Sequence, residues 1–384
     1  MGTLKVDTIQ DSGGNTILSS DGSGGFTNSL PAGKTSSYRN LIINGDMSLA
    51  QRGTSVSGLT NGSSQYLIDR FRWSEGGAPS AAFTMSQDTD VPTGQGFVKS
   101  LKLDCTTAQG SLAAGDRFGL DTKLEGQNLQ FLKFGTANSE SLTLSFWVKS
   151  NKTGTYNIWI YKEDGTARSF ASNYTISSAS TWEKKTINIP ADTAASGAID
   201  NDNGEGFRIT WMLAAGSNFN SGTTPTSWEN YTAANIGVNN VNFADDVAND
   251  FWLTGIQLEV GTTASDFEFL PYDVNLQRCM RYYFNHYTPD DNGLYGLFTA
   301  HTSSAGRMPY RFVVPMRDAP TVSSSTASGF TWLGNNTSGN PSAIGSESLN
   351  KYSCTVNITG SFTQGYSYWL AGSTSTQLNF DAEL

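Results

Sequence analysis

Residues 250–284 constrain the fold more than any other part of the sequence. Between positions 252 and 259 the chain alternates, with one set of side chains at Trp252, Thr254, Ile256 and Leu258 and the other at Leu253, Gly255, Gln257 and Glu259. This period of two is typical of a β-strand. A turn at Gly261–Thr263 follows, and Val274–Phe284 then carries apolar residues three to four positions apart, which predicts a short amphipathic helix. We therefore expect a long β domain to end here and a second unit to begin.

Short strands separated by turn residues are predicted along most of residues 38–272. The clearest lie at 100–105, 141–150, 155–163, 181–189, 207–213 and 251–260. Many short strands at this spacing indicate a two-sheet sandwich, with a jelly-roll as the leading candidate. After a connecting helix at 273–284, residues 285–384 predict a second β-sandwich, with strands at 293–299, 310–314, 330–333, 352–358 and 367–371. The expected fold class is all-β.

Charge and composition exclude several classes of function. The chain has 24 Lys and Arg against 34 Asp and Glu, a net charge of −10, so it lacks the positive footprint of a nucleic-acid-binding protein. From Asp192 to Asp250 the only basic residue is Arg208, and such a face tolerates neutral sugars or divalent cations better than phosphate or anionic lipid. No apolar run of transmembrane length and no signal peptide is visible, so we expect no membrane insertion. The three cysteines are far apart, which favours reduced thiols, and Cys105 falls in the apolar phase of its strand.

Catalytic motifs are absent from the sequence. There are two histidines, neither in a nucleophile motif, and no phosphate-binding loop or zinc-protease motif. Asp245 and Asp246 with Glu205 or Glu229 form a conceivable glycosidase pair, but a solvated acidic loop is the favoured interpretation. We therefore expect no catalytic residues and no enzyme activity.

Sugar recognition has the best physical case. Carbohydrates bind flat aromatic faces accompanied by amides and carboxylates. In strands 141–150 and 155–161, Trp147, Trp159 and Tyr161 fall on the polar phase, whereas Trp211 falls on the core phase of its own strand. The first three are predicted to line one sheet face that binds glycan; the alternative is that they are buried between subunits or domains. In the last domain, Tyr366, Tyr368 and Trp369 lie close together in the sequence and are either exposed on the surface or fill the core.

Several segments resemble bacteriophage tail-fibre and other virion structural proteins. The stretch at 250–284, read as DFWLTGIQLEVGTTASDFEFLPYDVNLQRCMRYYF, resembles the junction in these proteins between a jelly-roll strand and a QRYY helix. Further resemblances are carried, in order, by NLIINGDMSLAQRGTS, YLIDRFRW, SFWVKSNKTGTY, MPYRFVVPMRDAPTV and the final FDAEL. The opening MGTLKVDTIQDSGGNTILSSDGSGG is similar to the N-terminal segment of some marine phage fibres.

The resemblance implies a homotrimeric virion fibre, more often on the tail than on the head, assembled in the host cytoplasm. Residues 1–37, with short strands expected around Leu4–Thr8 and Thr16–Leu18, would anchor it to other virion proteins or remain a disordered tail. The C-terminal sandwich would form a tip that contacts host surface polysaccharide, with Tyr366, Tyr368 and Trp369 as candidates for its receptor-reading surface. The alternatives are a capsid decoration or head-fibre protein and, with less support, a glycan depolymerase.

No cofactor is expected beyond a structural calcium. The loop Asp200–Gly206 partly matches a calcium loop, but Gly204 and Glu205 break the pattern and a turn is favoured. By resemblance to sugar-binding jelly-rolls, which often hold calcium near the first strand, Asp46 is a further ligand candidate. The expected partner acid on the last strand is replaced by the region of Gln257. The weak metal candidates are thus Asp46, Asp200 and Asp202.

Overall fold

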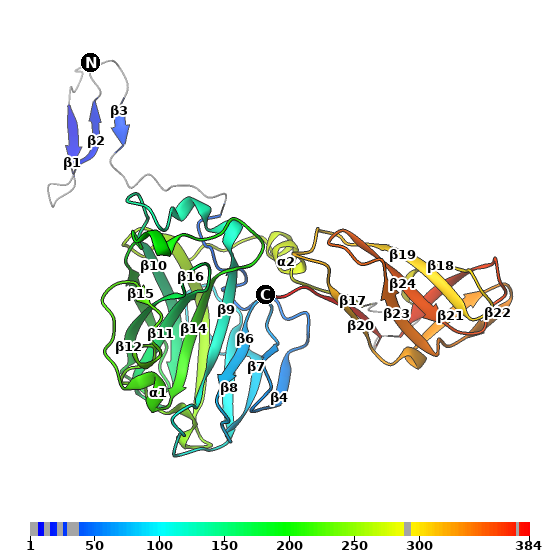
Figure 1. Ribbon diagram of the computed structural model, residues 1–384, viewed down its shortest axis with the longest axis horizontal. Helices are drawn as coiled ribbons and strands as arrows, with labels where there is room; N and C mark the ends of the chain where they lie inside the picture. The colour runs from blue at the N-terminus through cyan, green and yellow to red at the C-terminus, as the bar shows by residue number, and fades with distance from the viewer. Residues whose placement is uncertain (1–6, 11–15, 21–25, 29–37, 288–292, 374–375) are drawn as a thin grey trace.

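Two antiparallel sheets packed face to face form a jelly-roll (Figure 1). The structure is a computed structural model that describes residues 7–10, 16–20, 26–28, 38–287, 293–373 and 376–384. The six-stranded sheet has the order β13 (Glu183–Ile189), β10 (Leu142–Ser150), β16 (Asp250–Val260), β8 (Ser100–Thr107), β7 (Ala82–Asp88) and β4 (Ser55–Leu59). The seven-stranded sheet has the order β15 (Glu229–Asn230), β12 (Arg168–Ile176), β11 (Gly154–Lys162), β14 (Glu205–Ala215), β9 (Arg117–Glu125), β6 (Arg72–Gly76) and β5 (Gln65–Tyr66). The expected all-β class is confirmed.

The core between the two sheets follows the alternation of the strands. In β10, Leu142, Leu144, Phe146 and Val148 are all buried there, as their phase predicts. Trp211 of β14 is fully buried, and Cys105 of β8 is also in this core. Because side chains at every second position of a regular strand face the same side, the sequence pattern predicts which side chains of β10 enter the core.

The predicted strict alternation of β16 is wrong beyond Gly255. Phe251 and Leu253 face the core, but so do Ile256 and Leu258, so the phase changes between them. Gly255 has a φ of 62°, and the pairing of β16 with β10 shifts register between Ser145 and Trp147. This is a β-bulge, which inserts one residue and moves every later side chain to the opposite face.

Helix α2 (Tyr272–Met280) is shorter than the predicted helix over Val274–Phe284. The last two of those residues begin strand β17 (Tyr283–Tyr287), which pairs with β26 (Gln377–Asp381). Phe284 stacks on Phe380 with ring centroids 5.9 Å apart. A pairing almost a hundred positions away in the chain therefore overrides the local helical spacing.

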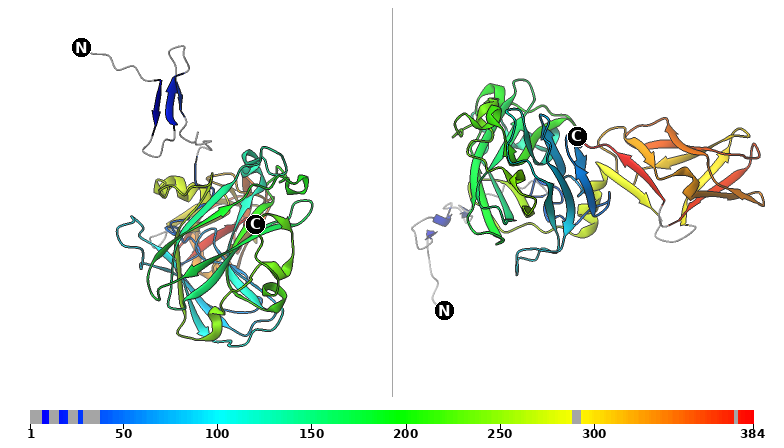
Figure 2. Two further views of the ribbon diagram at one scale, coloured as in Figure 1. Left: turned by 90° about the vertical axis from the view of Figure 1, so that its left-hand side faces the viewer. Right: turned by 90° about the horizontal axis from the view of Figure 1, so that it is seen from below.

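A second β-sandwich follows, with its own apolar core (Figures 1 and 2). One sheet has the order β17, β26 and β20 (Thr321–Ser324). The other has the order β22 (Thr337–Gly339), β21 (Phe330–Gly334), β25 (Ser367–Gly372), β18 (Gly293–Ala300), β19 (Ala305–Arg311), β24 (Ser353–Thr359) and β23 (Ala343–Glu347). The strand expected at 310–314 is in fact β19, which ends at Arg311.

Charged side chains join the two sandwiches. Arg281, just after α2, pairs with Glu125 of β9 through two contacts of 2.7 Å. Arg70 of the jelly-roll forms an ion pair with Glu383, and Arg52 lies 3.0 Å from Asp381. These contacts tie residues 381–383 back onto the first domain.

The N-terminal part contains three short antiparallel strands, β1 (Thr8–Gln10), β2 (Thr16–Ser20) and β3 (Phe26–Asn28). The expected strand residues Leu4 and Val6 lie outside the described residues. Within the described part of the chain, no helix is long and apolar enough to span a membrane.

Candidate functional site

The two sheets separate the three predicted glycan-binding residues. Trp147 lies on β10 of the six-stranded sheet, whereas Trp159 and Tyr161 lie on β11 of the seven-stranded sheet. The prediction that they line one face is therefore wrong. β10 and β11 are consecutive in the chain, but their hydrogen-bonded partners belong to opposite sheets, so their outward phases face opposite sides of the domain.

The outer face of the six-stranded sheet carries aromatic rings whose polar edges are already bonded. Trp252 donates from Nε1 to Asp88 at 3.0 Å, and Trp182 donates to Asp90 at 2.9 Å. Lys149 pairs with Asp90 and lies 4.1 Å from the ring centroid of Trp252. Such mutual satisfaction indicates a structural network, because little hydrogen-bonding capacity is left for a ligand.

Three aromatic rings meet on the outer face of the seven-stranded sheet. The centroids of Trp159 and Tyr161 are 5.4 Å apart, and Tyr231, which follows β15, lies 5.9 Å from Trp159 and 5.4 Å from Tyr161. We call Trp159, Tyr161 and Tyr231 the aromatic trio. Trp159 is only 3% exposed, since it also packs against Met212 and Ile236, whereas Tyr231 is 37% exposed. Trp159 is thus a support beneath the two tyrosines and not itself the predicted contact surface.

Polar groups without partners surround the trio. Among the described residues, Nε1 of Trp159, Oγ1 of Thr210 and Nε of Arg208 are buried and have no hydrogen-bond partner. The Arg117 guanidinium lies 5.3 Å from the Trp159 ring and has no ion-pair partner in the part of the chain that the structure describes. Burial lowers the pKa of Arg117. Buried polar groups in this condition are normally satisfied by ordered water or by a ligand.

A ladder of ion pairs continues the same face toward β6. Arg208 contacts Glu205 at 2.8 Å, and Glu205 also lies 2.7 Å from Lys123. Arg72 of β6 lies 2.7 Å from the buried carboxylate of Asp121. Glu205 and Asp121 are therefore each paired with basic side chains, and this part of the face carries ion pairs.

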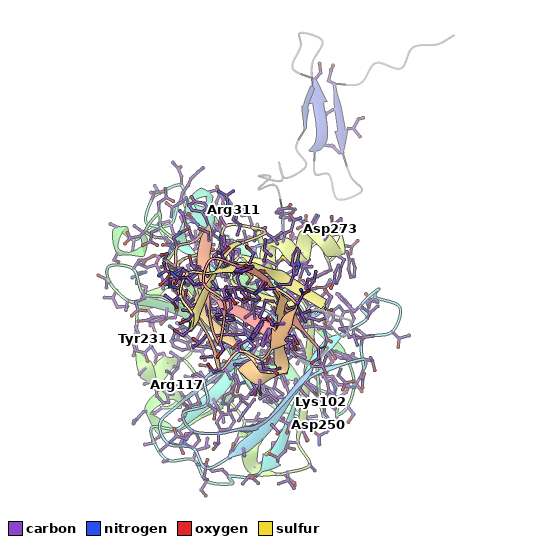
Figure 3. The ribbon with its side chains drawn as sticks, turned by 90° about the vertical axis from the view of Figure 1, so that its right-hand side faces the viewer. Lys102, Arg117, Tyr231, Asp250, Asp273 and Arg311 are labelled. Carbon is purple, nitrogen blue, oxygen red and sulfur yellow. The ribbon has the colours of Figure 1, made fainter. Side chains whose placement is uncertain are left out.

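Figure 3 shows the two faces at once. Arg117 and Tyr231 lie together on one side of the jelly-roll, while Lys102 and Asp250 lie together on the other. Lys102 and Asp250 form an ion pair of 3.0 Å, in keeping with the bonded character of the six-stranded face. The two sides thus differ in how much hydrogen-bonding capacity they leave open.

Tyr231 and Arg117 were not among the site residues predicted from the sequence. Tyr231 follows a strand of only two residues, so no periodicity marks it. Arg117 is the first residue of β9, before any alternation is established. The outward orientation of Arg208 can be predicted from the sequence, because this residue lies between the core residues Phe207 and Ile209.

The weak metal candidates are not brought together. In the described residues, no group of three or more His, Cys, Asp or Glu side chains has the arrangement needed to hold a metal. Asp46 instead accepts hydrogen bonds from Ser48 at 3.1 Å and Asn275 at 3.4 Å, and burial raises its pKa. Asp202 accepts a bond from the backbone N–H of Gly204 at 2.8 Å, which is turn chemistry.

The conceivable catalytic carboxylates are also engaged. Asp245 contacts Lys152 at 2.5 Å and Asn249 at 2.8 Å, and Glu229 accepts from Asn235 at 2.8 Å. A retaining or inverting glycosidase needs one acid whose pKa is raised beside a second carboxylate. Asp245 and Glu229 are instead held by an ion pair and by amide hydrogen bonds.

The candidates in the C-terminal sandwich divide between surface and core. Tyr366 and Trp369 are about half exposed, but Tyr368 is 1% exposed. Its ring stacks on Phe298 at 5.5 Å, and its hydroxyl accepts from the N–H of Thr363 at 2.9 Å. The prediction that Tyr368 belongs to a receptor-reading surface is therefore wrong, because the alternation of β25 turns it inward.

Comparisons with known proteins give weak likenesses only. No protein-family model matches the sequence, and no curated protein matches it. Among solved structures, the chain is similar to the enzymatically active domain of bacteriophage CBA120 tailspike protein 4, at 14% identity and a TM-score of 0.31, over 59% of this chain and 22% of that one. It is also similar to a family 11 carbohydrate-binding module of Clostridium thermocellum, at 13% identity and 0.28, over 54% and 97%. A putative sugar-binding protein of Bacteroides thetaiotaomicron gives 12% and 0.31, over 58% and 100%.

Proposed function

We propose that this chain is a phage virion fibre protein that binds host cell-surface glycans through the outer face of its seven-stranded sheet. The observation that carries glycan binding is the aromatic trio beside the unpaired guanidinium of Arg117. The proposed virion role rests on the resemblance of the junction at 250–284 and of the ordered segments around it. Its partners would be a homotrimer of this chain, other virion proteins and host polysaccharide.

The trio provides the two kinds of contact that a sugar needs. The C–H face of a pyranose ring would pack on Tyr231 and Tyr161, which Trp159 holds from below. Hydroxyl groups of the sugar would accept from Arg117 and replace the water that otherwise satisfies it. Each contact is weak, and several copies on one particle would raise the overall affinity by multivalency.

Glycan-array binding by the purified full chain tests this proposal. Tyr231→Ala should weaken binding to the best glycan roughly tenfold, the order of one lost aromatic contact. Tyr272→Ala is the matched control, since Tyr272 is also exposed but lies at the start of α2. Equal affinities of the two variants would exclude the trio as the binding surface. Incubating the bound glycan with the chain should leave its length unchanged, because we propose binding without cleavage.

Immunogold labelling of intact particles tests the virion role. We expect an antibody to residues 293–373 to label the tail. Labelling of the head would favour the alternative, a capsid decoration protein. Particles without any label would refute a virion role altogether.

A further inference from the structure

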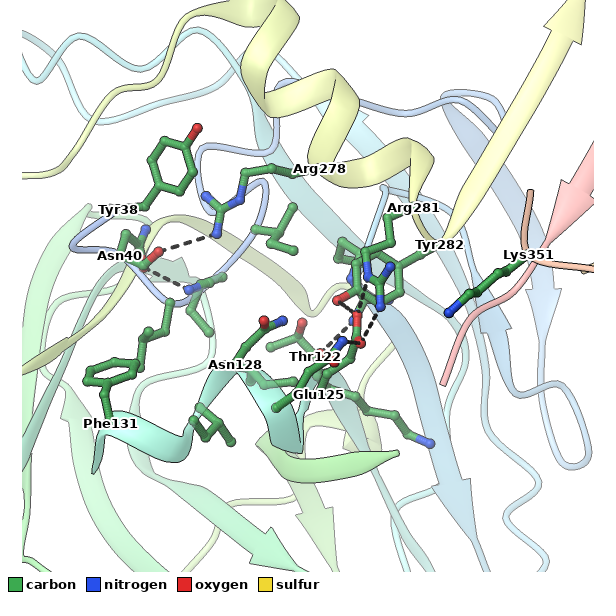
Figure 4. A pocket seen from close by; sticks show the side chains of 18 residues that line it. Tyr38, Asn40, Thr122, Glu125, Asn128, Phe131, Arg278, Arg281, Tyr282 and Lys351 are labelled. Carbon is green, nitrogen blue, oxygen red and sulfur yellow. Dashed lines mark hydrogen bonds and ion pairs between the residues drawn. The ribbon is translucent and has the colours of Figure 1, made fainter. Parts of the chain in front are cut away.

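A pocket of about 590 Å³ lies where the two sandwiches meet (Figure 4). Its walls come from five separate parts of the chain: the segment around Asn40, Arg70, the end of β9 with the turns that follow it, the end of α2, and Lys351 of the C-terminal sandwich. The volume falls within the range of small-molecule sites. The aromatic trio is not part of this pocket.

The walls carry an excess of positive charge in a protein whose net charge is −10. The basic side chains are Arg70, Lys123, Arg278, Arg281 and Lys351, and Glu125 is the one acidic residue in the lining. Three of the five cations are paired: Arg281 with Glu125, Arg70 with Glu383, and Lys123 with Glu205. The other two basic side chains are Arg278 and Lys351.

Arg278 has no carboxylate within ion-pair distance among the described residues. It donates a hydrogen bond to the backbone oxygen of Asn40 at 3.5 Å, and its guanidinium lies 4.8 Å from the ring centroid of Tyr38. Burial lowers the pKa of Arg278, and the nearby carboxylate of Glu268 offsets only part of that effect. A desolvated guanidinium of this kind is stabilised by an anion placed against it.

Lys351 stands at the other side of the pocket, beyond Arg281 and Tyr282 in Figure 4. It is exposed and also lacks an ion-pair partner within the described ranges, and its Nζ lies 5.2 Å from the ring of Tyr352. The exposed amide of Asn128 and the ring of Phe131 complete the lining, whereas the amide of Asn40 is already bonded to the backbone. The pocket thus combines unpaired positive charge with the groups that bind sugar hydroxyls and ring faces.

We propose that this pocket binds the carboxylate-bearing residue of an acidic saccharide, with Arg278 pairing to the carboxylate and Lys351 supplying a second positive charge. The choice of a saccharide rests on the proposed glycan-binding function; the anion site itself rests on the pocket alone. Because Lys351 comes from the second sandwich, the bound sugar would contact both domains.

Isothermal titration of the full chain with glucuronate, glucose and inorganic phosphate tests the proposal. Glucuronate should bind and glucose should not, and Arg278→Gln should weaken glucuronate binding roughly tenfold or more, as expected for loss of a charged hydrogen bond. Lys184→Gln is the control, because Lys184 is exposed on β13, none of whose residues line the pocket, and its replacement also removes one positive charge. Lys351→Gln, an exposed position whose change does not threaten folding, should weaken binding to a smaller extent.

Three results would overturn the proposal: no glucuronate binding by the wild type, equal affinity in Arg278→Gln and Lys184→Gln, or phosphate binding at least as tight as glucuronate binding. The last would make the pocket a general anion site. The two proposed binding sites are tested by different variants. Tyr231→Ala should leave glucuronate binding unchanged, and Arg278→Gln should leave neutral-glycan binding unchanged.

Discussion

The ion pair between Arg70 and Glu383 should contribute most to holding the two sandwiches together. The two side chains are 2% and 6% exposed, so both charges are almost completely removed from water. Arg70 also donates to the backbone oxygen of Lys123 at 2.5 Å and lies 3.5 Å from the ring centroid of Tyr282. Replacing Glu383 with Gln keeps the shape of the side chain and removes only its charge.

The magnitude follows from what the change leaves behind. Removing one partner of a buried ion pair costs about 3–5 kcal/mol, because the other charge stays buried and unpaired. Arg70 keeps the Lys123 carbonyl and the Tyr282 ring, and a desolvated cation–π contact is worth about 2 kcal/mol. We therefore expect a loss of about 3 kcal/mol, at the lower end of the range.

Denaturant unfolding of Glu383→Gln, Arg70→Met and the double variant measures the coupling between the two residues. The double-mutant cycle separates the interaction between Arg70 and Glu383 from the effects that each substitution has alone. The control is Glu347→Gln, which breaks the pair with Arg307, whose side chains are 36% and 51% exposed. An exposed pair contributes less than about 1 kcal/mol. A Glu383→Gln protein as stable as Glu347→Gln would refute the reasoning.

Three further changes test other features of the fold. Burial raises the pKa of Glu125, but hydrogen bonds from Arg281 and Tyr282 outweigh burial and hold this pKa below its usual value of 4.5. The stabilisation that Glu125 gives is therefore present above pH 4.5 and is lost as the pH falls through the lowered pKa. Glu125→Gln should flatten the acid side of a plot of unfolding free energy against pH. Gly255→Ala should cost about 2 kcal/mol in thermal denaturation, because its φ is 62° and the new methyl would lie 2.6 Å from a neighbouring aromatic ring. Tyr368→Ala should cost about 3–5 kcal/mol by chemical unfolding, and Trp369→Ala less than about 1 kcal/mol, since only the first ring is in the core.

What the sequence predicted correctly is what depends on neighbours along the chain. The core phase of β10 follows from alternation alone, and so does the burial of Trp211. The bulge at Gly255 breaks the same rule, although an isolated glycine inside a strand pattern is itself a signal of a bulge. The helix over Val274–Phe284 was extended too far because the strand pairing that ends it involves residues near position 380.

The candidate site depends on contacts that alternation does not determine. Trp147 and Trp159 have the same outward phase, yet they lie on opposite sheets, because the chain changes sheet between β10 and β11. Tyr231 joins Trp159 from a loop about seventy positions later. Phase can be read from one strand, whereas the identity of the sheet requires the whole topology.

The pocket between the two sandwiches also changes how the net charge of the protein should be interpreted. An overall charge of −10 argues against binding a polyanion, because most of the surface would repel it. At physiological ionic strength the field of a charge is screened over about 8 Å. Arg278 and Lys351 therefore determine the electrostatic potential inside the pocket, and the acidic surface determines it outside. The ligand that fits both is a largely neutral glycan with widely spaced acidic residues. Polygalacturonate should therefore bind no more tightly per residue than free galacturonate; tighter binding would show that the positive field extends beyond the pocket.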